Sequence, residues 1–186
     1  MRKSVFGLLV CLAPVASMAD TYQLDPTHTY PNFTVDHLGF STMNGTFLAT
    51  KGSFEMDLDK KTGSVDVTIE TGSIFTGFKK RDDHLRSPDF FNAAEFPEIT
   101  YKSTKVKFKG DKAATVEGKL TIMGVTKDVT LDVDNISCGP NPFNKKMTCG
   151  FNATTKVMRT DFGMKYGIPA IGDEISIRLE AEGIKQ

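Results

Sequence analysis

Three histidines, His28, His37 and His84, are the side chains best suited to bind a metal ion or to transfer a proton near neutral pH. No two of them are spaced as H-x-H, and no H-E-x-x-H motif is present. The sequence therefore encodes no local set of zinc ligands, and we expect no metal site.

Other catalytic patterns are also missing. There is no G-x-S-x-G motif to activate a serine, and the stretch Gly39-Phe40-Ser41 does not form a phosphate-binding loop. The carboxylates Asp82 and Asp83 lie in a charge-rich stretch, which is typical of a solvated helix face rather than of an acid–base pair. We therefore predict a protein that is not an enzyme and that requires no cofactor.

The first 19 residues have the pattern of a secretory signal peptide. Arg2 and Lys3 precede an almost wholly apolar run at 5–15, and small residues at Ser17 and Ala19 place a cleavage site before Asp20. The run is too short to cross a membrane as a helix, although an uncleaved N-terminal anchor is the alternative. We expect an exported domain of residues 20–186 without an integral membrane segment.

Export changes how the charges and cysteines are interpreted. Loss of Arg2 and Lys3 leaves 21 basic against 23 acidic residues, a balance that does not favour binding to nucleic acid.

Cys11 is removed with the signal peptide. Cys138 and Cys149 remain, and an even pair in an exported chain favours a disulfide. A redox or metal pair is the alternative, but no C-x-x-C spacing supports it.

Alternating apolar and polar residues predict antiparallel strands with one solvated face. The alternation is clear at residues 65–70, 116–122, 129–133, 151–157 and 175–182, and short turns such as 123–126 separate the strands. About eight strands would close into a barrel, although a sandwich has the same alternation. The charged stretch at 78–85 instead favours a short helix that ends near Ser87 and Pro88.

Phenylalanines are concentrated in the irregular part of the chain. Nine of them lie between Phe33 and Phe96. Apolar side chains on irregular segments must be buried against something, and the interior of a small barrel either is filled by side chains or holds one ligand. Composition alone favours a barrel plugged by these rings.

Four stretches of the chain resemble the YceI family of lipocalin-like periplasmic proteins. They are YQLDPTHTYPNFTVDHLGFSTMNGTF at 22–47, IFTGFKKRDDHLRSPDFFNAAEFPEITYKS at 74–103, GKLTIMGVTKDVTLDV at 118–133 and TTKVMRTDFGMKYGIP at 154–169. The resemblance implies an all-β fold, an extended eight-stranded antiparallel lipocalin-like barrel with a short helix near 78–86 and a buried apolar tunnel. It also implies a periplasmic location and binding of a polyisoprenoid, such as an isoprenoid quinone or polyprenyl phosphate, or of another long-chain lipid. Thr29-Tyr30 and the segment between the cysteines depart from the family pattern.

Candidate site residues follow from apolar or polar character within these four stretches. We expect the tunnel to be lined or capped by Phe33, Val35, Phe40, Phe47, Phe75, Leu85, Phe91, Phe96, Ile99, Leu120, Ile122, Phe162 and Ile168. Polar candidates for the head group are His37, Arg81, Asp82, His84, Arg86, Arg159 and Asp161. The alternative for Arg81, Asp82, Arg86, Arg159 and Asp161 is an ion-pair network that fixes the helix to the barrel.

Two functions are consistent with these features of the sequence. The first is a periplasmic lipid-binding protein that holds a polyisoprenoid for transport or storage. The second is a stress-response or interaction protein that acts through a partner or as a homodimer, with an incidental cavity. An enzyme acting on a lipid head group ranks third.

Overall fold

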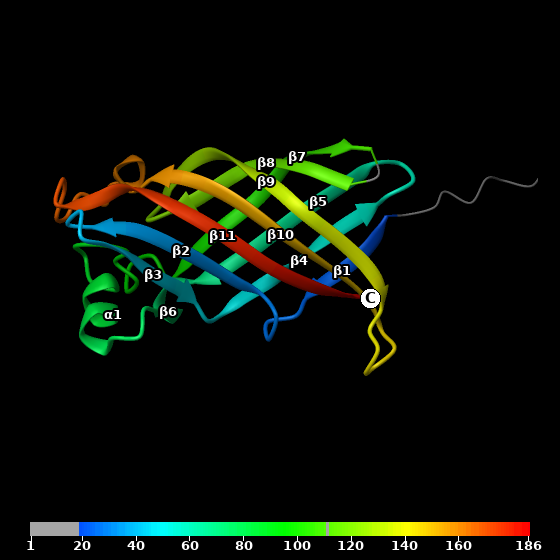
Figure 1. Ribbon diagram of the computed structural model, residues 1–186, viewed down its shortest axis with the longest axis horizontal. Helices are drawn as coiled ribbons and strands as arrows, with labels where there is room; N and C mark the ends of the chain where they lie inside the picture. Colours follow the sequence, from blue (N-terminus) through cyan, green and yellow to red (C-terminus); the bar gives the residue numbers. More distant parts are fainter. Residues whose placement is uncertain (1–18, 111) are drawn as a thin grey trace, which may run out of the picture.

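The computed structural model describes residues 19–110 and 112–186, and its strands form one antiparallel sheet that closes on itself (Figure 1). The predicted signal peptide lies almost entirely outside the described residues. The strands are β1 (Asp20–Leu24), β2 (Tyr30–His37), β3 (Ser41–Phe47), β4 (Thr50–Asp57), β5 (Thr62–Glu70), β6 (Ile74–Phe75), β7 (Glu98–Lys109), β8 (Lys112–Ile122), β9 (Val125–Pro140), β10 (Met147–Met158) and β11 (Ile171–Lys185).

Closure of the sheet depends on β11. This strand pairs with β10 along one edge, and on its other edge it pairs with β2 near its start and with β1 near its end. The ring therefore runs β1-β4-β5-β7-β8-β9-β10-β11 and back to β1, with β2, β3 and β6 extending the wall from β11. The predicted eight-stranded antiparallel barrel is confirmed, and ring closure distinguishes it from a sandwich.

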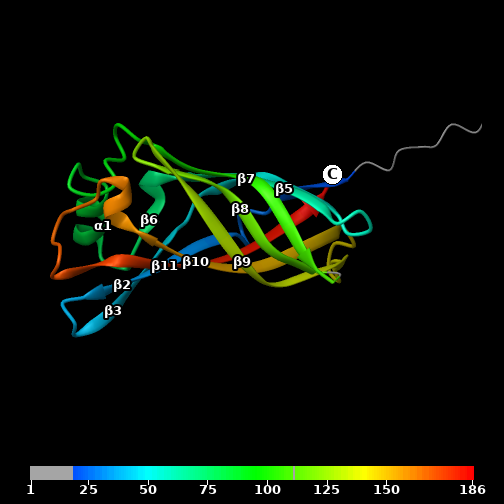
Figure 2. The ribbon, with the colours of Figure 1, turned by 90° about the horizontal axis from the view of Figure 1, so that it is seen from above.

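The remaining segments lie at one end of the barrel. There β6 pairs with β3, while the chain at 76–97 carries α1 (Lys79–Leu85) before β7 begins. The helix, the β2–β3 turn and the segment at 159–170 gather at this end, which we call the helix end (Figure 1, Figure 2). The predicted helix near 78–86 is confirmed, and it stops before Ser87 because Pro88 disfavours helical backbone at the residue preceding it.

Cys138 and Cys149 form the expected disulfide between β9 and β10 at the opposite end, which we call the disulfide end. The tight reversal predicted at 123–126 is a two-residue hairpin. Met123 and Gly124 both have positive φ, at 50° and 73°, which is the geometry of a type I′ turn that matches strand twist. No helix in the described part of the chain is long and apolar enough to cross a membrane.

Aromatic rings pack the disulfide end of the barrel. Tyr22 and Phe54 stack with ring centroids 5.0 Å apart, and Phe151 meets Phe54 edge-on at 5.5 Å. Gly183 on β11 lies under this group, since a Cβ there would sit 2.4 Å from the Phe54 ring. The missing side chain thus creates the space that the rings occupy.

We expect Gly183→Ala to lower the free energy of unfolding by about 1–3 kcal/mol, because the methyl group overpacks a ring already held by two others. Gly150→Ala on neighbouring β10 is the matched control, since its Cβ would meet its nearest neighbour at 3.4 Å. Urea denaturation measures both changes. Equal losses for the two variants would contradict this account of the packing.

Candidate ligand-binding cavity

The barrel encloses a cavity of about 570 Å³ that follows its length. At the disulfide end the lining includes Leu24, Phe54 and Cys149, and at the helix end it includes His37 and Tyr166. Most lining side chains are aliphatic or aromatic, because the inward-facing positions of each strand alternate with polar outward ones. The barrel is therefore not filled by its own phenylalanines.

Nine of the thirteen predicted apolar residues line this cavity. They are Phe33, Val35, Phe47, Leu85, Phe91, Ile99, Leu120, Ile122 and Phe162. Phe33 and Phe91 both contact Phe47, with ring centroids 5.9 and 5.5 Å away, so three of these rings form one group on the wall.

The other four predicted apolar residues lie outside the cavity lining. Phe40 is 88% exposed at the β2–β3 turn, Phe75 is 48% exposed on β6, and Ile168 is 37% exposed in the 159–170 segment. The Phe96 ring lies beside Gly124 of the β8–β9 turn. All but Phe75 belong to irregular segments, where no strand alternation indicates which way a side chain points.

Several lining residues were not among the predicted site residues. They include inward positions of regular strands and three residues of the helix end: Val65, Val67, Leu131, Ile175, Ile177, Leu179, Phe90, Met164 and Tyr166. The strand residues carry the alternation signal, so periodicity alone would have found them. The other three lie on irregular chain, and no local signal marks them.

Four of the seven polar candidates line the cavity: His37, Arg81, His84 and Arg159. Arg159 is 4% exposed, and its guanidinium donates to the backbone carbonyls of Gly172, Met164 and Ile171 at 2.8, 3.3 and 3.1 Å. Burial lowers the pKa of Arg159, while the nearby Asp173 carboxylate opposes that shift. Arg159 thus carries a desolvated charge at the cavity wall.

Arg81 and Asp82 are linked through Thr76. Arg81 donates from Nε to Thr76 Oγ1 at 2.7 Å and from Nη2 to the Thr76 carbonyl at 2.8 Å. Asp82 of α1 is buried outside the cavity lining and accepts hydrogen bonds from the Thr76 amide and hydroxyl. The pair therefore joins the helix to the chain that enters it.

Arg86 and Asp161 also lie outside the cavity lining. Arg86 pairs with Asp83 at 2.9 Å and donates to the carbonyls of Gly72 and Ile74, whereas Asp161 is exposed. Arg81, Asp82, Arg86, Arg159 and Asp161 therefore do not form one ion-pair network. Backbone carbonyls, rather than carboxylates, hold most of these guanidinium groups.

His84 belongs to an aromatic group at the cavity mouth. Its ring lies 5.1 Å from Phe90 and 4.9 Å from Tyr166, and its Nε2 lies 2.8 Å from Asp89. In the parts of the chain described by the structure, no group of three or more His, Cys, Asp or Glu side chains is arranged to hold a metal ion.

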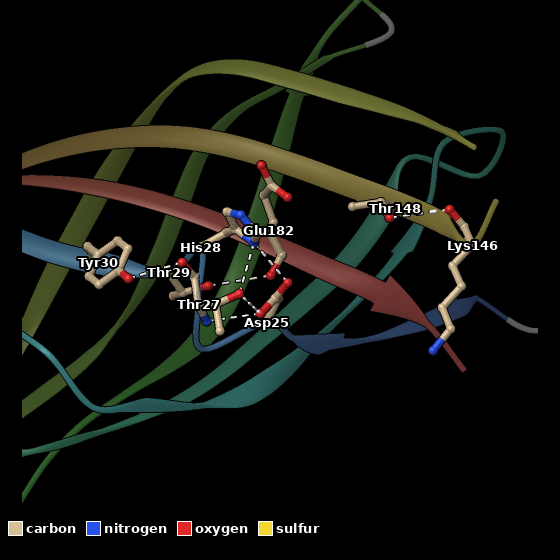
Figure 3. Close-up of polar contacts among 8 residues, drawn as sticks. All are labelled: Asp25, Thr27, His28, Thr29, Tyr30, Lys146, Thr148 and Glu182. Atoms are coloured by element: carbon tan, nitrogen blue, oxygen red, sulfur yellow. Dashed lines mark hydrogen bonds and ion pairs between the residues drawn. The ribbon is translucent and has the colours of Figure 1, made fainter. Parts of the chain in front are cut away.

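A polar turn interrupts the barrel wall between β1 and β2 (Figure 3). Asp25 accepts hydrogen bonds from the Thr27 amide and hydroxyl, and lies 2.9 Å from His28 Nδ1. The Thr27 hydroxyl and then His28 lower the pKa of Asp25 to about 2, and Asp25 followed by Glu182 raises the pKa of His28. The turn positions the next two residues, Thr29 and Tyr30, in the cavity lining.

The same view shows a turn contact in the disulfide hairpin, where the Thr148 hydroxyl donates to the Lys146 carbonyl at 3.3 Å (Figure 3). This contact is local to the hairpin, whereas the β1–β2 turn is tied to β11. The amide of Asp25 donates to the Glu182 carbonyl at 2.8 Å. The β1–β2 turn therefore stabilises the wall beside the cavity.

We expect Asp25→Asn to reduce stability by about 1 kcal/mol near pH 5–6, because solvent screens this exposed turn. The lowered pKa of Asp25 gives stability that is present above its ordinary value of 3.8 and is lost as pH falls toward 2. The raised pKa of His28 gives stability that is present below 6.5 and is lost as pH rises through the raised value. The difference from wild type should therefore shrink on both sides of this window.

Urea unfolding from pH 3 to pH 8 measures this difference. Asp134→Asn is the control, because the Asp134 side chain is exposed on β9. A penalty for Asp25→Asn that does not change with pH would show that the turn geometry matters, and not its charges.

Closed eight-stranded antiparallel architecture around an apolar cavity defines this protein as a lipocalin-like barrel. The chain belongs to the YceI-like domain family, which matches residues 22–183. Protein YceI of Escherichia coli O157:H7 is 37% identical over 192 residues, covering 100% of both chains.

Two solved structures have the same fold. BcnA of Burkholderia cenocepacia is 23% identical with a TM-score of 0.73, and the match covers 86% of this chain and 98% of that one. A polyisoprenoid binding domain from Saccharophagus degradans, implicated in plant cell wall breakdown, is 16% identical with a TM-score of 0.66. That match covers 91% of this chain and 100% of the domain.

Proposed function

We propose that this protein binds a long-chain polyisoprenoid in the barrel cavity and holds it for transport or storage in the periplasm, after removal of residues 1–19. The observation that carries the proposal is the cavity of about 570 Å³ along a barrel whose inward side chains are mostly apolar. This volume lies within the usual range for small-molecule sites. The protein acts as a binder rather than as an enzyme.

An apolar tail suits this cavity energetically. Each buried CH₂-sized group contributes about 0.8 kcal/mol, so a tail of several isoprene units supplies a large gross driving force. Loss of translational freedom and ordering of the tail offset much of it. The family membership and the fold shared with a domain named for polyisoprenoid binding support the same ligand class.

A second candidate function is binding of a partner protein or of a second copy of the chain. Two phenylalanines favour it, because Phe40 is 88% and Phe143 is 93% exposed at opposite ends of the barrel. In that case the cavity is incidental, and blocking it leaves the biological phenotype intact.

We expect Val35→Trp to block the cavity, since Val35 on β2 faces inward between Ile175 and Met43. Thr34→Trp on the outward face of the same strand is the matched control. Protein purified gently from its own host should contain polyisoprenoid in the wild type and in Thr34→Trp. It should contain at least tenfold less in Val35→Trp, by organic extraction and mass spectrometry.

Circular dichroism checks that Val35→Trp folds, and Val35→Phe provides a milder block. Wild-type protein that carries no lipid and takes up neither quinones nor polyprenyl phosphates would refute the proposed function. An unchanged phenotype with an empty Val35→Trp cavity would favour the partner-binding alternative.

A further inference from the structure

We propose that the cavity has a fixed polarity, in which an anionic head group binds against Arg81 and Arg159 at the helix end and the hydrocarbon tail points toward the disulfide end. The head group would be a phosphate, a diphosphate or a carboxylate rather than a neutral quinone or alcohol. This inference rests on the proposed function and names the class of lipid that the cavity selects.

Charged lining residues are divided between the two ends. Those at the helix end are all basic, namely Lys80, Arg81 and Arg159. The two acidic lining residues, Glu55 and Glu180, lie elsewhere. Glu180 pairs with Tyr30 on β2, whereas the helix-end start of β11 pairs with His37. Tyr30 and His37 are seven residues apart on β2, so this separation is roughly 23 Å at 3.3 Å per residue.

Arg159 has an incompletely compensated charge. Its three hydrogen bonds go to backbone carbonyls, which leaves two of its five N–H donors for other partners. No carboxylate lies within ion-pair distance of it among the residues described, and the nearby Asp173 carboxylate accepts from the Thr160 amide and hydroxyl. A guanidinium that is 4% exposed favours an anion that reaches it through the cavity.

Arg81 and Arg86 provide an internal comparison. Both belong to the same helical segment, but only Arg81 lines the cavity. Arg86 is paired directly with Asp83, whereas Arg81 contacts a carboxylate only indirectly, through the Thr76 hydroxyl that donates to Asp82. The arginines that face the cavity are thus the ones without a direct ion pair in the described chain.

An aromatic group connects the two arginines. The Arg159 guanidinium lies 6.0 Å from the Phe90 ring, and Phe90 contacts His84 and Tyr166. His84 follows Arg81 by one helical turn, so it shares the same helix face. Both cations therefore border one mouth of the cavity.

The opposite end suits a tail. Tyr22, Phe54 and Phe151 pack against one another there beside buried Cys149. No lysine or arginine lines the cavity at that end among the described residues. An anion would lose its hydration there without gaining a partner, which costs several kcal/mol. Hydrocarbon carries no such cost, so the ligand is oriented.

The test uses two ligands with the same C20 tail, geranylgeranyl phosphate and geranylgeraniol, in isothermal titration with purified, delipidated protein. We expect the wild type to bind the phosphate at least about tenfold more tightly than the alcohol. Arg81→Gln should reduce this ratio toward one, because it should weaken binding of the phosphate much more than binding of the alcohol. Arg86→Gln is the matched control and should keep the wild-type ratio.

The outcomes separate this inference from the proposed function. Equal affinity for phosphate and alcohol in the wild type would overturn the anionic head group while leaving lipid binding intact. Failure to bind either ligand, together with the absence of lipid from host-purified protein and of quinone uptake, would refute the proposed function itself. Inorganic phosphate alone should compete weakly, and competition as strong as that of the prenyl phosphate would replace the lipid site with a simple phosphate site.

Orientation has its own readout. A geranylgeranyl phosphate with a diazirine at the tail end should crosslink to peptides around Phe54 and Phe151. Crosslinks concentrated instead on residues 76–91 or 159–166 would show that the tail enters the other way and would overturn the proposed polarity.

Discussion

Pairing of β11 with two separate segments on one edge is the constraint on which the whole molecule depends. Residues 183–185 hold β1 and close the ring, while the start of the same strand holds β2 and extends the wall. Because the ring has eight positions, its interior is wide enough for one small ligand and no wider. Small inward residues such as Gly183, Gly45 and Ala153 leave space inside the barrel, and aromatic rings fill part of that space.

Much of the fold was predictable because strand alternation is a local property of the sequence. It indicated the antiparallel strands, the hairpin at 123–126 and the inward faces of β5 and β11, including Val65 and Ile177. The breaks between β1 and β2 and between β3 and β4 were not predictable in this way. They depend on pairing of β1 and β2 with β11 and of β3 with β6, and these partners are distant in sequence.

Site residues were likewise predictable on regular strands and not on irregular segments. Phe33, Leu120 and Ile122 line the cavity as expected, and regular strands fix their direction. Phe40 and Ile168 have the same chemistry but lie on turns, where backbone geometry rather than periodicity sets the side-chain direction. For the same reason, the sequence did not indicate Phe90 and Tyr166, whose positions depend on contacts between the 76–97 segment and the 159–170 segment.

Placing a helix rather than a strand at one end of the wall explains why a mostly apolar barrel can have a polar mouth. An inward strand face repeats every second residue and is buried along its length, so charge there is costly. A helix presents residues i, i+3 and i+4 together, and Arg81, His84 and Leu85 all face the cavity from α1. One turn of helix thus combines a cation, a hydrogen-bonding ring and an aliphatic side chain. The neighbouring strands continue the apolar surface, and this difference in secondary structure gives one cavity a polar mouth and an apolar interior.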